Sequence, residues 1–384
     1  MSISFILTSY NVAPFLPRCL QSLAAVARAG DEVILVDDGS DDGSADLIAT
    51  GLGTFGFGPD VALHPVCLGT NTMGGVGIPA NIGLSMASRE AVFFVDGDDW
   101  IIPQGFNCAR SQMRLTPADI VVANYRVFDD RTGTSRRPAD GDRWHRLDGG
   151  ADLETLRLQA LSLIGVPWRK LYRRGFLDAA GLRFPEGDFF YEDNPFHWAV
   201  CLAAGSIRFV DVALCQHRVN RPGQTMAEDG MALAAFFTHF ETIGRMLPGK
   251  DARHHRLAVA WLIENMAWHC DRLSAEALYP YALRAASALV GIPGPLWAES
   301  LAQNGHLHPV WFAADRLRRG DVAGQVGSWE QARLHRRLAG IESRLDEIAG
   351  TSGDTLARLR GQDAADRFAA IRAAAAQADG PQAT

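Results

Sequence analysis

Three aspartates follow an apolar run that has the character of a buried strand. Residues 91–95 are AVFFV, and Asp96, Asp98 and Asp99 come directly after them. Carboxylates this close together repel one another unless a cation binds them, and hard oxygen ligands favour Mg²⁺ or Mn²⁺. The carboxyl end of a buried strand is also where α/β sheets bind ligands. The pattern predicts a divalent-metal site, although an acidic turn after an ordinary strand has the same sequence appearance.

The elements that position these aspartates follow from hydrophobic periodicity. Strands are predicted at 3–7, 33–36, 61–63 and 91–95, and helices at 15–29, from 44, and at 79–87. This alternation predicts a mostly parallel sheet covered by helices. Asp37 and Asp38 end the second strand as the later aspartates end the fourth. Because parallel strands share one carboxyl edge, both acidic groups are expected to face one crevice.

The pattern changes after residue 100. A helix is predicted at 104–115, an exposed polar loop at 129–146, and strands at 120–127, 207–210 and 213–217. Helical periodicity then dominates at 231–247, 253–272 and 275–290, where Trp261 and Trp268 are expected to pack internally.

A heptad pattern marks the tail of the chain. Its apolar positions are Leu334, Leu338, Ile341, Leu345 and Ile348. They predict either a short coiled coil or a helical hairpin with residues 354–377. The final residues are expected to fray.

Composition limits the classes of protein that remain. The chain has 384 residues, 47% hydrophobic and 21% charged, with a net charge of −7. The length predicts two or three units, and the lack of a basic block argues against a nucleic-acid partner. Six cysteines without C-x-x-C spacing fit a cytoplasmic protein. No signal peptide or spanning segment is predicted, so any membrane contact would be peripheral, at the inner face of the cell membrane.

Several motifs occur in a characteristic order. These are TSYN at 8–11, VILVDDGSDDGS at 33–44, NIGLSMASREAVFFVDGDDW at 81–100, WRKLYRRGFLDAAGLRFPEG at 168–187, YEDNPF at 191–196 and HRVNRPGQT at 217–225. Over residues 2–226 the chain resembles the family-2 glycosyltransferases, which are inverting, nucleotide-sugar-dependent enzymes. The resemblance implies an α/β fold of GT-A type, Rossmann-like with a mostly parallel sheet flanked by helices, here with an appended C-terminal all-helical region.

The resemblance implies a donor site at the first two strand ends. Tyr10 would stack on the nucleobase, with Thr8, Asn11 and Asp38 beside it. A carboxylate can accept a hydrogen bond from a uracil N–H, so a UDP-linked sugar is the expected donor.

The aspartates after the fourth strand would form the D-x-D motif of this family. Asp96 and Asp98 would hold ribose and Mn²⁺ or Mg²⁺, with Asp98 as the first metal ligand and Asp99 close behind. Lys170 and Arg221 are the basic side chains whose motif context favours diphosphate binding, and 217–225 is expected to act as a lid.

Glu192 and Asp193 form the second acidic pair. Inverting transfer needs a carboxylate that takes the proton of the acceptor hydroxyl. The resemblance implies that Asp193 is this base and that Glu192 is an acceptor-binding neighbour, although a Glu-Asp pair is also a common helix start. One departure from the family is Ala80, which stands where many relatives have Arg and is preceded by GGVGIP. A diphosphate or base contact made by that Arg is therefore absent or supplied elsewhere.

The predicted function is metal-dependent transfer of a sugar from a nucleoside-diphosphate donor to a glycan or lipid-linked glycan, as in polysaccharide biosynthesis. The catalytic domain is expected at 1–226, with a nucleotide-binding half at 1–100 and an acceptor half at 101–226. A helical region follows at 227–322, and a helical tail at 323–384 would either mediate homo-oligomer formation or pack on the body. The alternatives are a non-catalytic GT-A-like scaffold and a sugar-nucleotide nucleotidyltransferase, which should carry a glycine-rich basic loop after its first strand.

Overall fold

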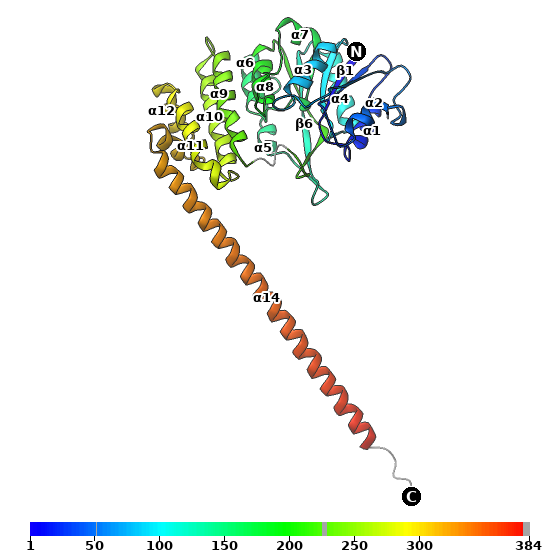
Figure 1. Cartoon of the computed structure of the whole chain (residues 1–384), viewed down its shortest axis with the longest axis vertical. Coiled ribbons are helices and arrows are strands. Elements are labelled where there is room, and N and C mark those ends of the chain that lie inside the picture. Colours follow the sequence, from blue (N-terminus) through cyan, green and yellow to red (C-terminus); the bar gives the residue numbers. More distant parts are fainter. Residues whose placement is uncertain (51, 225–228, 379–384) are drawn as a thin grey trace. The chain divides into compact units, whose positions relative to one another are not determined.

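The computed structural model describes residues 1–50, 52–224 and 229–378 (Figure 1). The chain divides into two units, Met1–Val322 and Ala323–Thr384. Residues 225–226, at the predicted end of the catalytic domain, and 379–384, the predicted frayed end, lie outside the described residues.

The first four strands form the parallel part of one sheet. They are β1 (Ile3–Ser9), β2 (Glu32–Asp37), β3 (Ala62–Cys67) and β4 (Ala91–Asp96). Their order is β3-β2-β1-β4, and every neighbouring pair is parallel. The connecting helices are α1 (Leu16–Ala24), α2 (Ser44–Thr50) and α3 (Gly77–Met86), with a 3₁₀ turn, η1, at Leu52–Thr54. The strand–helix alternation predicted for this half is confirmed.

The sheet continues as a mixed sheet with the strands of the second half. These are β5 (Trp100–Ile101), β6 (Ile120–Asp129), β7 (Thr134–Arg136), β8 (Lys170–Arg173) and β9 (Ile207–Val219). The order beyond β4 is β8-β6-β9-β5, with β7 paired to β6. β8 runs antiparallel to β4 and β6, whereas β6 and β9 are parallel. The α/β class is confirmed; the first four strands pair only in parallel, and β6 and β9 form a further parallel pair.

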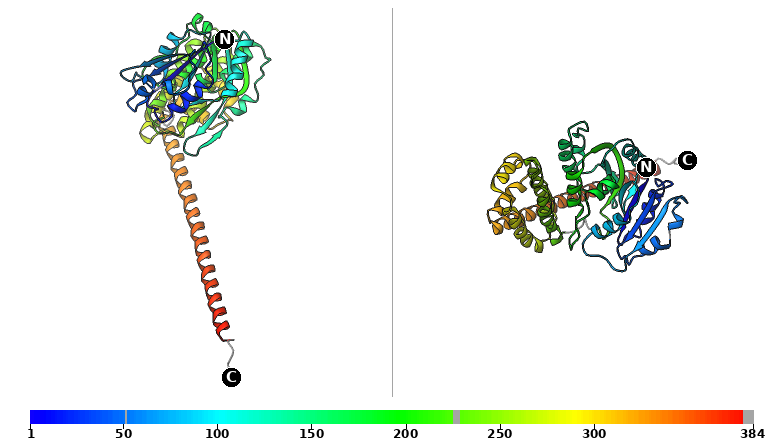
Figure 2. Two further views of the ribbon diagram at one scale, coloured as in Figure 1. Left: turned by 90° about the vertical axis from the view of Figure 1, so that its right-hand side faces the viewer. Right: turned by 90° about the horizontal axis from the view of Figure 1, so that it is seen from above.

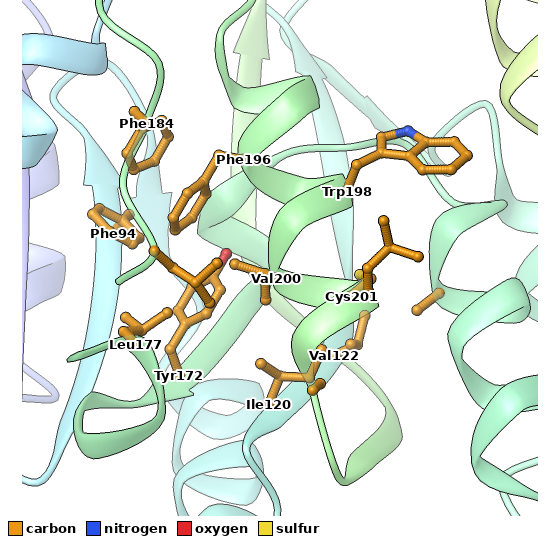
Figure 3. Packing of buried hydrophobic residues seen from close by; sticks show 14 of the residues in the cluster. Phe94, Ile120, Val122, Tyr172, Leu177, Phe184, Phe196, Trp198, Val200 and Cys201 are labelled. Carbon is orange, nitrogen blue, oxygen red and sulfur yellow. The ribbon is translucent and has the colours of Figure 1, made fainter. Parts of the chain in front are cut away.

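Helices cover both faces of this sheet. The remaining ones in the second half are α4 (Pro103–Leu115), α5 (Gly141–Trp144), α6 (Leu153–Leu161), α7 (Arg174–Ala179), α8 (Asp193–Ala203) and the 3₁₀ turn η2 (Pro167–Arg169). Neighbouring residues of β4 point to opposite faces, so Phe93 packs against Phe106 of α4. Phe94 packs on the other face against Phe184 and Phe196 (Figure 3).

Two predictions for the second half are wrong. Residues 129–146 are not simply an exposed loop, because they contain β7 and α5, and Asp140 and Trp144 are buried. The two strands predicted at 207–217 are one strand, β9. Its register against β6 jumps from Val210 to Ala213. This bulge interrupts the alternation of side chains, so the single strand resembles two short ones in sequence.

The helical region packs as part of the first unit. Its helices are α9 (Ala235–Met246), α10 (Ala252–Cys270), α11 (Ala275–Val290), α12 (Gly294–Asn304) and α13 (Val310–Arg318), preceded by the 3₁₀ turn η4 (Met231–Ala234). Figures 1 and 2 show these yellow helices beyond the green segments, on the side away from the blue N-terminal strands.

The tail is one helix, α14 (Val322–Ala378). The alternative of a helical hairpin with residues 354–377 is wrong, because the helix continues through Gly350 and Gly353. None of the described helices combines the length and the apolar character that crossing a membrane requires.

Candidate active site

The carboxyl ends of β1, β2 and β4 bring two of the predicted acidic groups to one edge of the sheet. Thr8 on β1 is in register with Asp96 on β4, and Ser9 is in register with Asp37 on β2. Backbone hydrogen bonds extend this edge, since Gly97 N donates to Thr8 O (2.9 Å) and Asp38 N donates to Ser9 O (2.8 Å). The ends of these strands therefore carry the acidic residues predicted for this edge of the sheet.

Tyr10 and Asn11 form the turn that leaves β1. The Tyr10 side chain is 48% exposed beside this edge. Asn11 adopts a φ of 50°, and its Oδ1 accepts a hydrogen bond from Asp41 N (3.0 Å). Asparagine tolerates this left-handed conformation better than most residues. Asn11 thus shapes the turn, and the half-exposed Tyr10 side chain lies beside it.

Asp38 binds a loop that sequence reasoning did not single out. Its Oδ1 accepts a hydrogen bond from Thr72 N (3.0 Å), and its Oδ2 accepts from Thr72 Oγ1 (2.9 Å) and Asn71 Nδ2 (3.2 Å). Burial raises the pKa of Asp38 despite these donors. The polar run TNT at 70–72 was the available signal.

The three aspartates at the carboxyl end of β4 converge as predicted. Asp96, Asp98 and Asp99 each offer an oxygen within 4.8 Å of the others. Burial, followed by Asp99 and Asp98, raises the pKa of Asp96 well above its usual range. Buried like charges of this kind are stabilised when a hard cation binds them. The donor set therefore fits Mg²⁺ or Mn²⁺.

Asp99 is the most heavily bonded of the three. Its Oδ2 contacts His217 Nδ1 at 3.0 Å, and its Oδ1 accepts a hydrogen bond from Arg218 N (2.7 Å). Burial opposes protonation of His217, but Asp99 and the neighbouring aspartates raise its pKa to about 9. The imidazole also stacks on Trp168, with ring centroids 4.7 Å apart. His217 and Trp168 lay in the quoted motifs, yet sequence reasoning gave them no role.

The predicted basic residues occupy different places. Arg221 reaches the acidic edge, where its Nε donates to Asp98 Oδ2 (2.5 Å). Lys170 is fully buried, and its Nζ donates to Val166 O. Burial lowers the pKa of Lys170 to about 7. Arg221 thus lies at the acidic edge of the sheet, whereas Lys170 lies in the interior.

Glu192 lies at the start of α3 rather than on an open surface. Only 2% of Glu192 is exposed, and its Oε1 accepts a hydrogen bond from Gly77 N (2.6 Å). A carboxylate is favoured at the positive N-terminal end of a helix. Burial nevertheless raises its pKa to about 7. A Cβ at Gly75 would lie 2.6 Å from Glu192 Oε1, so a larger residue at position 75 would force this buried carboxylate to move.

Asp193 begins α8 and is held by a hydrogen-bonded chain of side chains. Burial raises its pKa to about 6, and Lys170 opposes this rise. Asn194 Nδ2 donates to Asp193 Oδ1 (3.0 Å) and to Tyr191 O (3.1 Å). Trp261 Nε1, on α10, donates to Asn194 Oδ1 (3.3 Å). The helical region therefore orients the amide that binds Asp193.

The backbone before this pair is strained. Tyr191 has a φ of 67°, which is unusual for a bulky residue. Its ring packs against Phe236 and Trp268, with centroids 4.9 Å and 6.3 Å away. Such strain persists only where surrounding contacts stabilise it, and it clusters at functional sites.

Comparison with known proteins identifies the class to which this arrangement belongs. Residues 4–181 match the model of glycosyl transferase family 2. The chain is 28% identical over 255 residues to the uncharacterized glycosyltransferase EpsJ of Bacillus subtilis, covering 63% of this chain and 71% of EpsJ. It is 26% identical over 229 residues to the poly(ribitol-phosphate) beta-N-acetylglucosaminyltransferase TarS of Staphylococcus aureus, covering 59% of this chain and 37% of TarS.

The fold agrees with this class. The crystal structure of TarS residues 1–349 in complex with UDP-GlcNAc matches with a TM-score of 0.68 at 20% identity, covering 87% of this chain and 92% of that one. Residues 4–181 thus form a family-2 glycosyltransferase domain, and the protein is a glycosyltransferase of GT-A fold. The predicted resemblance, fold class and enzyme class are confirmed.

Proposed function

We propose that this glycosyltransferase is inverting and metal-dependent, and that it transfers a sugar from a UDP-linked donor to a hydroxyl group of a glycan or lipid-linked glycan. The observation that carries the proposal is the convergence of Asp96, Asp98 and Asp99 at the edge where Thr8 and Asp38 also lie. UDP is favoured because the TarS structure with this fold was obtained with UDP-GlcNAc.

The donor nucleotide would bind along the ends of β1 and β2. Tyr10 is exposed enough to stack on the base. Thr8, Asn11 and Asp38 supply polar groups around it. Asp38 keeps lone pairs for a base N–H, because each carboxylate oxygen accepts more than one hydrogen bond.

The acidic cluster would hold the metal. Asp98 and Asp96 are the proposed ligands of Mn²⁺ or Mg²⁺, with Asp99 beside them and positioned by His217. When bound, the metal neutralises the negative charge that develops on the leaving nucleoside diphosphate. Arg221 contacts Asp98, the proposed metal ligand. Its guanidinium therefore lies close enough to bind an oxygen of the diphosphate that the metal would hold.

Asp193 would act as the general base. With a pKa of about 6 it is mostly ionised at neutral pH, yet basic enough to take a proton. The acceptor hydroxyl loses its proton to Asp193 while the hydroxyl oxygen forms a bond to the anomeric carbon of the donor sugar. The bond from that carbon to the diphosphate breaks on the opposite face. Lys170, buried nearby, favours the charged carboxylate, and Glu192 holds the adjacent loop.

The acceptor and location are inferred from a related enzyme and from the sequence. TarS is named as a beta-N-acetylglucosaminyltransferase for poly(ribitol-phosphate). We infer a role for this chain in polysaccharide biosynthesis, on the cytoplasmic side of the cell membrane and in peripheral contact with it.

Calorimetric titration tests the donor half of the proposal. UDP, GDP and dTDP are each titrated with Mn²⁺ and with EDTA. If UDP is the nucleotide that binds in a metal-dependent manner and the other two do not, the proposed UDP-linked donor is supported. If GDP or dTDP binds in this manner instead, the donor carries that nucleotide. Binding of none of them favours the non-catalytic scaffold.

The Asp193→Asn variant tests the catalytic half. Loss of transfer with intact UDP binding supports a base at this position. Loss of both would indicate that Asp193 is structural.

A further inference from the structure

Helix α14 carries an apolar stripe that nothing covers within the described residues of the tail. Leu334, Leu338, Ile341, Leu345 and Ile348 are between 47% and 62% exposed. They recur at intervals of four, three, four and three residues. A 3.5-residue repeat keeps such side chains on one seam only if the helices supercoil around each other.

We propose that this seam joins identical copies of the chain in a parallel coiled coil. The proposal is independent of the catalytic role assigned above. A long helix with an exposed apolar stripe gains little stability in water by itself, because helical stability comes mainly from packing of that stripe. A second copy supplies the same stripe in the complementary position.

The charged residues beside the seam favour identical, parallel partners. Leu338 and Leu345 take heptad position a, which places Arg337 and Arg344 at g and Glu342 at e. In a parallel pair, position g of one chain faces position e of the following heptad in the other. Arg337 would therefore face Glu342 of the partner subunit. An antiparallel pair would bring the g positions together and oppose arginines to one another.

The residues at the a and d positions of the seam also indicate how many chains assemble. Leucine at a combined with isoleucine at d shifts coiled coils from dimers towards trimers and tetramers. Ile341 and Ile348 occupy d, with Leu334 at the first d position. We expect three or four chains in the assembly.

Sedimentation equilibrium of the full chain tests the seam. Wild-type protein should have three or four times the monomer mass, and Ile341→Lys should shift it to monomer. Ser343→Lys is the matched control, because it adds the same charge at an exposed position off the seam. A monomeric wild type, or equal effects of both substitutions, would overturn the proposal. A dimer would keep the seam and overturn the stoichiometry.

Two further experiments test the orientation. Leu334→Cys should form a disulfide between copies under mild oxidation only if the helices are parallel and in register, because an antiparallel pair would place residues from the other end of the seam opposite it. The unsubstituted chain, treated alike, controls for native cysteines.

Arg337→Glu and Glu342→Arg should each weaken assembly, and the double variant should restore it. Failure of the double variant to recover, together with no cross-link of the Leu334→Cys variant above that control, would overturn the parallel arrangement.

Discussion

Trp261 should act on catalysis through a single hydrogen bond, although it lies on α10, outside the resemblance to the family. Its Nε1–H donates to Asn194 Oδ1, which leaves the Asn194 amide N–H group to donate to Asp193 Oδ1. Trp261→Phe keeps an aromatic ring near Phe236, whose centroid is 5.6 Å away, but removes the donor. The side-chain amide of Asn194 then has no donor that holds its oxygen towards residue 261, so its nitrogen is no longer fixed towards Asp193.

The sign of the effect follows from the charge of the base. A donor to Asp193 stabilises its ionised form, so losing this bond raises the pKa from about 6. A hydrogen bond to a charged group contributes about 1.5 kcal/mol, or about one pKa unit. Because only the ionised base accepts a proton, Asn194→Ala should lower kcat about fivefold at pH 6 and very little at pH 9. Trp261→Phe should shift the acidic limb of the profile of kcat against pH in the same direction, towards higher pH, by a smaller amount.

Other ionisable groups near Asp193 remain unchanged in these variants. They are Lys170, Glu192, Asp96 and Tyr172. Their contributions are common to wild type and variants, so the shift between two pH–rate profiles isolates the hydrogen bond. The assay is the initial rate of nucleotide release at saturating donor and acceptor across the pH range.

Trp268→Phe is the matched control. It makes the same change on the same helix, and its ring packs edge-on against Tyr191. The acidic limb should stay in place for this variant. The double variant of Asn194 and Trp261 should shift no further than Asn194→Ala alone, because both act through one contact. A rate loss in Trp261→Phe that is equal at every pH would refute the reasoning and leave Trp261 as a packing residue.

Three further substitutions test other parts of the structure. Asp98→Ala should weaken nucleotide binding about tenfold or more in Mn²⁺ and leave binding in EDTA unchanged by calorimetry. Gly75→Ala should lower stability by about 1–3 kcal/mol in urea melts, because its Cβ displaces a buried carboxylate, whereas Gly69→Ala meets no atom within 4 Å and should be neutral. Asp140→Ala should cost about 3–5 kcal/mol in the same melts, since it leaves the fully buried Arg169 without its carboxylate partner; a loss below about 1 kcal/mol would contradict this.

The acidic edge of the sheet was predictable because its signals are local. A short apolar run that ends in aspartates marks both a buried strand and its carboxyl end. Parallel pairing then places the ends of β1, β2 and β4 together, as the register of Thr8 with Asp96 shows. No contact between distant segments is needed for that step.

The interior around Arg169 was not predictable in the same way. Asp140 lies in a polar stretch whose composition is typical of an exposed loop. It is buried because it pairs with Arg169, 29 positions later in the chain, and Trp144 packs beneath the same guanidinium at 5.4 Å. A buried ion pair has the sequence signature of two surface residues, so only the tertiary structure distinguishes them.

The glycine-rich segment before Asn81 shows how a departure from the family can have a structural cause. Its spacing resembles a dinucleotide loop, yet Gly75 and Gly77 are close to Glu192, where a Cβ would come within 2.6 Å and 2.9 Å of that side chain. The same loop begins at Thr72, which binds Asp38. One loop therefore contacts both Asp38, which we propose binds the nucleobase of the donor, and Glu192, which precedes the proposed general base Asp193. A donor that orders Thr72 would also stabilise Glu192, so this loop connects the proposed donor site with the residue next to Asp193.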